Sequence, residues 1–262
     1  MTAALWSVKT PAILAGLSIV VMGCATTPRP TGPTSVAPGP PNARPGVIER
    51  HAAQFANELP RRPPGSNEEQ VAASYILGFL QQANYPGRLE GVPVADLIRS
   101  TNVIATPPRG AAPEFLVGVP SGTPSNVALD AHSIGAFLEV ARALSVRRPG
   151  HAVEFVALGA EFAEQEAGTL GSRAMASLLR DDSFEPQIIY LSPELSGGSF
   201  HAQGPLASRF KPAASSGVAP LHEIALAAAD AYRNEGFEVT VIDGDPTVVA
   251  DTLLEFLSRS TG

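Results

Sequence analysis

The side chains best suited to metal or acid–base chemistry in this chain are those of Asp130, His132, Glu161, Glu166 and Glu194. Imidazole nitrogens and carboxylate oxygens bind Zn²⁺, and a carboxylate can act as a general base on a metal-bound water. The spacing Asp130-x-His132 lacks a third partner of its own, so a surface or helix-capping role for His132 stays open. The acidic residues at 161–166 are equally compatible with a solvated stretch of the surface.

Two other kinds of catalysis find no support in the sequence. A Gly-x-Ser-x-Gly elbow does not occur, and Ser172 stands in a pattern typical of a helix start rather than of a strand-to-helix turn. Cys24 is the single cysteine, so neither a disulfide within one chain nor a thiolate metal site can form. Any chemistry in this chain therefore depends on histidine and carboxylate side chains.

The elements that must position these residues can be read from the apolar spacing. Helices are predicted at 47–59, 66–83, 131–144, 170–180, 221–235 and 246–258, and strands at 101–105, 114–118, 152–158, 187–191 and 237–242. Ser66 and Glu69 form a capping box at the start of the second helix. Alternating strands and helices predict an α/β fold in three layers, a mostly parallel sheet with helices on both faces, with function at the carboxyl ends of the strands.

The order of these segments resembles a known family. The runs are RRPPGSNEEQVAASYILGFLQQANY, STNVIAT, EFLVGV, NVALDAHSIGAFLEVARAL, HAVEFVALGAEF and GTLGSR, which together cover about residues 60–192. In this order they are similar to the zinc-dependent exopeptidases of the leucyl aminopeptidase, aminopeptidase Y and glutaminyl cyclase type. The resemblance implies an α/β domain with two zinc ions at the strand ends, where a metal-bridged water attacks a carbonyl and a Glu acts as general base.

The first two ligand motifs of that family are altered here. Where the family has a His and an Asp after its EFLVG strand, this chain has Gly118–Gly122 (GVPSG), with no imidazole and no carboxylate. In the next motif Leu129 stands at the position of the bridging Asp, and Asp130 would reach it only through a one-residue shift of register. Leucine cannot bridge two metals, so the resemblance predicts that these ligands are lost.

The later motifs are altered as well. Counted forward from FVALG, Glu161 takes the general-base position and Phe162 replaces a metal-binding Glu; counted back from LGS, the pair becomes Gln165 and Glu166. The fourth ligand position falls on Ser192, with Glu194 two residues later. We therefore expect a degenerate relative without bound metal, in which Glu161 is vestigial as a general base. Leu129 and Phe162 are expected to fill the space left by the metals.

The amino-terminal segment predicts export and anchoring. Residues 1–23 contain Lys9 and then the apolar run 12–23, too short to span a bilayer, which is typical of a secretory signal. The sequence around Cys24 resembles a bacterial lipobox, which predicts lipid attachment at Cys24. The proline-rich residues 24–45 are expected to be a tether, and residues 46–262 the α/β domain. We expect a lipid-anchored envelope protein, at the outer membrane and facing the periplasm.

Two hypotheses for function follow. The net charge of −7 and the absence of Lys/Arg clusters argue against nucleic acid as a partner. The first hypothesis is a non-catalytic domain, without a cofactor, that binds a peptide, a cell-wall fragment or an envelope protein. The second is a working zinc exopeptidase whose metal is held by a rearranged set drawn from Asp130, His132, Glu161, Glu166 and Glu194.

Overall fold

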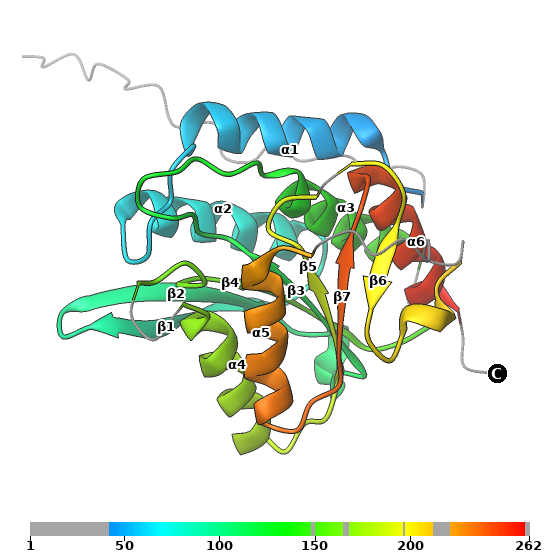
Figure 1. Cartoon of the computed structure of the whole chain (residues 1–262). Coiled ribbons are helices and arrows are strands. Elements are labelled where there is room, and N and C mark those ends of the chain that lie inside the picture. The colour runs from blue at the N-terminus through cyan, green and yellow to red at the C-terminus, as the bar shows by residue number, and fades with distance from the viewer. Residues whose placement is uncertain (1–41, 148–149, 165–167, 196, 212–220, 260–262) are drawn as a thin grey trace, which may run out of the picture. The chain divides into compact units, whose positions relative to one another are not determined.

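The computed structural model describes residues 42–147, 150–164, 168–195, 197–211 and 221–259. These residues contain a seven-stranded sheet in the order β1-β2-β4-β3-β5-β7-β6 (Figure 1). The strands are β1 (Gly87–Ala95), β2 (Ile98–Ala105), β3 (Phe115–Pro120), β4 (Val153–Leu158), β5 (Gln187–Leu191), β6 (His201–Gln203) and β7 (Val239–Asp243). Strands β4, β3, β5 and β7 are parallel, and the pairs β1–β2, β2–β4 and β6–β7 are antiparallel. The predicted α/β fold with a mostly parallel, mixed sheet is confirmed.

Helices cover both faces of this sheet (Figure 1). One face carries α1 (Pro45–Glu58), α2 (Asn67–Gln82), α3 (His132–Arg147) and α6 (Pro246–Ser258), and the other carries α4 (Leu170–Asp181) and α5 (Glu223–Asn234). Strand β4 shows why two cores form: Phe155 and Ala157 belong to the first, whereas Val156 and Leu158 belong to the second. Successive side chains of a strand point to opposite faces, so an uninterrupted apolar strand needs both faces covered.

Helix α3 is the most enclosed helix of the first face. Every residue from Ser133 to Leu144 is buried, because the sheet lies on one side and α1 and α6 pack on the others. Helix α1 comes closest at Gly135, where a Cβ atom would lie 2.6 Å from the carbonyl oxygen of Ile48. A glycine inside a helix costs about 1 kcal/mol of helix propensity relative to alanine. Here its lack of a side chain lets the two helices pack backbone to backbone.

Two strands were not predicted from the sequence, β1 and β6. Strand β1 contains Gly87, Gly91 and Pro93, which are poor strand formers, and its pairing with β2 is irregular between Pro93 and Ala95. It forms because β2 offers a complete row of pairing partners, and the resulting hairpin projects from the sheet (Figure 1). Strand β6 has only three residues, which is too short for an alternating pattern to be recognised.

The folded part of the chain begins before Gly46. The backbone N–H of Ala43 donates to Asp251 of α6 (3.1 Å), and that of Arg44 donates to Glu139 of α3 (2.8 Å). Helix α1 then starts at Pro45, a favoured first position because proline has no N–H to leave unpaired. The last residues assigned to the tether are therefore attached to the α3 and α6 side of the domain.

Several predictions concern residues that the structure does not describe. The signal segment 1–23, Cys24 and the tether up to residue 41 lie outside the described residues. In the part of the chain that is described, no helix is both long and apolar enough to cross a membrane.

Candidate functional site

Two hydroxyl groups and one carboxyl group follow the carboxyl ends of the parallel strands. Ser121 follows β3 and Ser192 follows β5, and both are fully buried. The hydroxyl of Ser121 donates to the carbonyl oxygen of Leu158 at the end of β4 (3.1 Å). The hydroxyl of Ser192 has no hydrogen-bond partner among the described residues. Serine hydroxyls therefore occupy two of the strand ends at which the family resemblance implies metal ligands.

Glu161, in the loop after β4, points into the protein. Its side chain is fully buried and accepts three hydrogen bonds: from the Ser172 backbone N–H (2.7 Å), the Ser172 hydroxyl (2.9 Å) and the Tyr190 hydroxyl (2.8 Å). Ser172 lies in the first turn of α4, whose N–H groups have no partner within the helix. Glu161 therefore connects the β4–α4 loop to the start of α4 and to β5.

Burial also changes the acidity of Glu161. Desolvation raises the pKa of this carboxyl from its ordinary 4.5 to about 7, although the hydrogen bonds from Tyr190 and Ser172 favour the ionised form. A general base must reach the proton it removes, directly or through one water. With its exposed fraction at zero and its oxygens held by Ser172 and Tyr190, Glu161 does not reach solvent in this conformation.

The loop that carries Glu161 is fixed by a buried amide as well. The Asn102 side chain of β2 accepts a hydrogen bond from the Gly159 backbone N–H (2.9 Å) and donates one to the carbonyl oxygen of Gly171 (2.9 Å). A Cβ atom on Gly171 would lie 2.0 Å from the carbonyl oxygen of Gly159, so only glycine allows this approach. These contacts fix the start of α4 against the end of β4.

A second buried carboxyl group, Glu69, lies beside the same loop. The predicted capping box is half right: the Ser66 hydroxyl accepts from the Glu69 backbone N–H (3.1 Å), as expected. The Glu69 carboxylate, however, accepts from the N–H groups of Gly65 (2.7 Å) and Ala160 (3.1 Å) and from the Ser100 hydroxyl (2.7 Å). The Glu69 carboxylate departs from the capping-box geometry because it is buried and needs several hydrogen-bond donors. Ser100 in β2 and Ala160 after β4 supply two of them.

Asp130, His132 and Glu194 come together on the surface, with Glu49 of α1 as a fourth member. The imidazole Nδ1 of His132 contacts the Asp130 carboxylate, and its Nε2 lies 3.0 Å from an oxygen of Glu49. The Asp130 backbone N–H lies 3.4 Å from a Glu194 oxygen. Partial burial lowers the pKa of His132, but the hydrogen bonds with Glu49 and Asp130 together raise it above its ordinary value. We call these four residues the acidic cluster.

Leu129 and Phe162 do not fill one common space, so that expectation is wrong. Leu129 lines a surface groove of about 400 Å³ against α1. The Phe162 ring lies 6.4 Å from that of His222 and borders a different hollow with Val94 and Ile98 of the β1–β2 hairpin. The two residues stand on loops that leave the sheet in different directions, and spacing along the sequence does not report this.

The described residues do not fit a two-zinc site. Within the described ranges, no group of three or more His, Cys, Asp and Glu side chains could hold a metal ion. The two ring nitrogens of His132 point away from each other, so one ion bound at either nitrogen cannot reach both Asp130 and Glu49. Glu166 lies outside the described residues.

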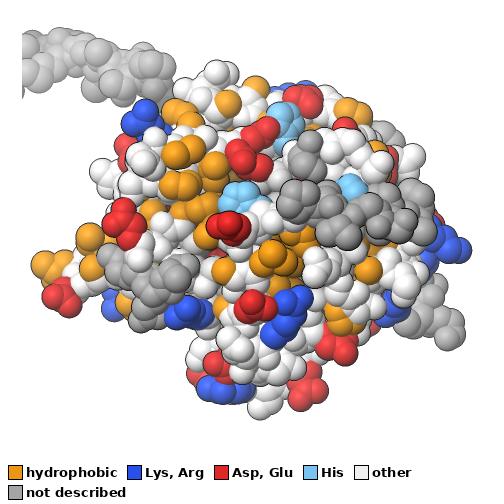
Figure 2. Space-filling model, viewed as in Figure 1, with side chains coloured by type: hydrophobic (Ala, Val, Ile, Leu, Met, Phe, Trp, Pro, Cys, Tyr) orange, Lys and Arg blue, Asp and Glu red, His pale blue; other side chains and the backbone are white. Residues whose placement is uncertain are grey.

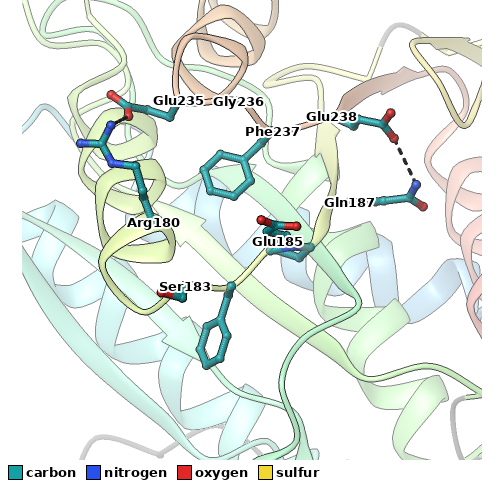
Figure 3. Close-up of a pocket in the computed structure, with 10 residues that line it drawn as sticks. Arg180, Ser183, Glu185, Gln187, Glu235, Gly236, Phe237 and Glu238 are labelled. Carbon is teal, nitrogen blue, oxygen red and sulfur yellow. Dashed lines mark hydrogen bonds and ion pairs between the residues drawn. The ribbon is translucent and has the colours of Figure 1, made fainter.

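A larger hollow, of about 580 Å³, lies at the other end of the strands, where β5 and β7 begin. It is formed where α4 and α5 end and where β5 and β7 begin, and it contains the Arg180–Glu235 ion pair and a hydrogen bond from Gln187 to Glu238 (3.2 Å) (Figure 3). Ligand sites of open α/β sheets lie at the carboxyl ends of the strands. This hollow is at the amino ends, so the site is sought elsewhere.

Comparison with solved structures identifies the fold. A leucine aminopeptidase precursor from Bacteroides thetaiotaomicron superimposes with a TM-score of 0.67 at 13% identity, covering 84% of this chain and 99% of that one. The chain has the zinc-dependent exopeptidase fold. A putative Zn-dependent exopeptidase from Bacteroides vulgatus (TM-score 0.63, 14% identity, 84% and 98% covered) and the glutaminyl cyclase of Porphyromonas gingivalis (0.65, 14%, 82% and 98%) match similarly. No protein-family model and no curated protein matches the chain.

With the exopeptidase fold in place, the role of each candidate can be stated. Glu161 lies in the loop after β4, as the predicted strand at 152–158 implies, but its spacing could not show that the side chain turns inward. Glu49 was missed because it lies in α1, far along the sequence from the other members of the acidic cluster. An acidic residue on the exposed face of α1 gave no signal that could have distinguished it from other surface residues.

Proposed function

We propose that this chain is a lipid-anchored envelope protein whose exopeptidase-like domain binds a partner and does not cleave it. The observation that carries the proposal is the orientation of Glu161. At the general-base position implied by the family resemblance, the carboxyl group is buried and engaged with Ser172 and Tyr190. Glu161 in this orientation stabilises the β4–α4 loop. Among the described residues, no other carboxylate lies beside a group of side chains that could hold a metal ion, where it could act as a base.

The chemistry of the implied ligand positions supports the same proposal. Leu129 and Phe162 are hydrocarbon side chains, and Ser192 carries a neutral hydroxyl that is buried. Zn²⁺ in proteins is held by thiolate, imidazole and carboxylate groups. A chain that had kept two zinc ions would need other residues to compensate for these three replacements.

The experiment is a zinc titration of the full chain, purified in detergent without chelators. We expect less than one zinc per chain by plasma mass spectrometry and no rise in the thermal midpoint with added Zn²⁺. A ligand that binds the folded state alone at 100 times its Kd would stabilise it by about 3 kcal/mol, which is readily detected. We also expect no hydrolysis of leucine p-nitroanilide. Stoichiometric zinc together with hydrolysis would show that the proposal is wrong.

The alternative is a zinc exopeptidase with a rearranged metal site drawn from Asp130, His132, Glu161, Glu166 and Glu194. The observation in its favour is that Asp130 lies beside both His132 and Glu194 at the surface. Under this alternative, His132→Ala would abolish zinc binding and hydrolysis together. Under our proposal, the same substitution changes neither measurement.

We propose further that Cys24 carries the lipid and places the domain in the cell envelope, at the outer membrane and facing the periplasm. The partner would then be a peptide, a cell-wall fragment or another envelope protein. The test is labelling with an alkyne fatty acid in a bacterial host, followed by fractionation. We expect label on the parent chain and none on Cys24→Ser, which should move from the membrane to the soluble fraction. An unlabelled parent would refute anchoring through Cys24.

A further inference from the structure

The groove beside α1 combines an apolar floor with an acidic end. Ala52, Ala53 and Ala56 come from α1 and Pro60 lies two residues beyond its end, and the facing segment contributes Ala128, Leu129 and Ala131. The three alanines of α1 contribute only methyl groups to the floor of the hollow, whose volume is about 400 Å³. This volume lies within the range of pockets that bind small ligands or a few side chains. Figure 2 shows hydrophobic side chains gathered between α1 and α2, bordered by acidic and histidine side chains.

The acidic end of the groove belongs to the acidic cluster. Glu49, Asp130 and His132 line the hollow directly, and Glu194 adjoins Asp130. The cluster combines one imidazole with three carboxyl groups, of which Glu49 and Asp130 contact the His132 ring, so its formal charge is negative whether His132 is protonated or not. The Glu49 and Asp130 side chains are 67% and 42% exposed, so both are accessible to a ligand.

We propose that this groove binds an extended peptide segment in which a Lys or Arg side chain is flanked by apolar residues. The cation lies against Glu49 and Asp130, and the apolar side chains cover Ala53, Ala56 and Leu129. The proposal rests on the proposed function, because it names the partner class of a domain that binds without cleaving. Ion pairing of this kind sets the orientation of the segment, and burial of apolar side chains against the floor adds affinity.

The floor distinguishes a peptide from a glycan strand. A glycan presents hydroxyl groups along its length, and each would lose hydrogen bonds to water over methyl groups without gaining a replacement. A peptide with Leu-sized side chains instead removes apolar surface of both partners from water, at about 25 cal/mol per Å². The apolar floor therefore favours the peptide.

The experiment is calorimetric titration of the full chain at low salt with three hexapeptides, each acetylated at its amino terminus. They share the sequence Gly-Leu-X-Leu-Ala-Ala, with lysine, acetyllysine or glutamate at X. We expect the lysine peptide to bind about tenfold more tightly than the acetyllysine peptide, with the advantage reduced at 0.5 M salt, and the glutamate peptide to bind more weakly still. Equal affinity for the three peptides, or no binding of any, would overturn the proposal.

Substitutions in the groove test its acidic end and its apolar floor separately. We expect Glu49→Gln and Asp130→Asn each to weaken binding of the lysine peptide about fivefold and to leave the acetyllysine peptide unchanged. Ala53→Leu, at an exposed position of α1, is expected to fill the floor and weaken both peptides. Glu58→Gln, the same charge change on the same helix outside the groove, should remain within about twofold of the parent.

The outcomes also separate this proposal from the one on which it rests. If the chain binds zinc and hydrolyses leucine p-nitroanilide, the proposed function is wrong whatever the peptides do. If it does neither and shows no preference for lysine, only the assignment of the groove is wrong. If Glu49→Gln and Asp130→Asn bind the lysine peptide as tightly as the parent, a site elsewhere binds the peptide and the groove is refuted.

Discussion

Glu161→Gln tests directly whether this carboxyl group is a buried structural residue. In the folded chain Glu161 accepts hydrogen bonds from the Ser172 backbone and from the Ser172 and Tyr190 hydroxyls. Glutamine has the same shape, and its carbonyl oxygen can accept from the Ser172 N–H. Its amide can donate to the two hydroxyl oxygens, because hydroxyls both donate and accept. The variant should therefore fold, and it removes a proton-binding group from the core.

The expected effect follows from the raised pKa of Glu161. Burial raises it from the ordinary 4.5 to about 7, so the folded chain binds this proton more tightly than the unfolded chain does. The resulting stability is fully present below pH 4.5 and is lost as pH rises to about 7. At 1.36 kcal/mol per pKa unit, the parent loses roughly 2 to 3 kcal/mol between pH 5 and 8 through this group. The glutamine variant lacks that loss.

The assay is urea unfolding followed by far-ultraviolet circular dichroism at pH 5, 6, 7 and 8. Tryptophan fluorescence is unsuitable because the single tryptophan, Trp6, lies outside the described domain, in the predicted signal segment. Glu154 is also buried with a pKa raised to about 7, but it is present in both proteins and cancels in the comparison. Glu58→Gln on the surface of α1 serves as the control and should keep the parent's pH dependence. Parallel pH profiles of parent and Glu161→Gln would refute the burial argument.

Three further substitutions test the packing that positions the site. Gly135→Ala should lower the free energy of unfolding by about 1 to 3 kcal/mol, because the added Cβ would meet the Ile48 carbonyl oxygen at 2.6 Å. This cost exceeds the gain from the better helix propensity of alanine. An unchanged thermal midpoint would contradict the close approach. Asn102→Ala leaves the buried Gly159 N–H unpaired and removes one donor to the Gly171 carbonyl oxygen, which keeps its helical partner in α4. It should cost about 1 to 3 kcal/mol in urea unfolding, and an unchanged free energy of unfolding would mean that another group pairs with Gly159. Asp245→Ala removes the side-chain cap of α6 and should cost about 1 kcal/mol by the same assay, and no loss would show that the cap is dispensable.

The order of the elements could be predicted from sequence because each has a local physical signal. Helix α6 begins at Asp245-Pro246, where a carboxylate cap precedes a proline, and its predicted range, 246–258, is the observed one. Strand β4 is apolar at every position except Glu154, which is typical of a strand whose sheet is covered by helices on both faces. Strand β1, with two glycines and a proline, has no such signal, and its structure depends on pairing with β2.

The sequence by itself determined which residue types stand at the strand ends, and the tertiary structure decided what each can do. Leu129 and Phe162 have hydrocarbon side chains without metal-binding atoms, and Ser192 has only a neutral hydroxyl in place of a carboxylate, wherever the fold places them. These departures from the family pattern were visible from the sequence. Whether Glu161 faces solvent or the core depends on contacts with Ser172 and Tyr190, 11 and 29 residues away, which spacing does not encode. The acidic cluster likewise exists only because the packing of α1 on α3 joins residues 83 positions apart.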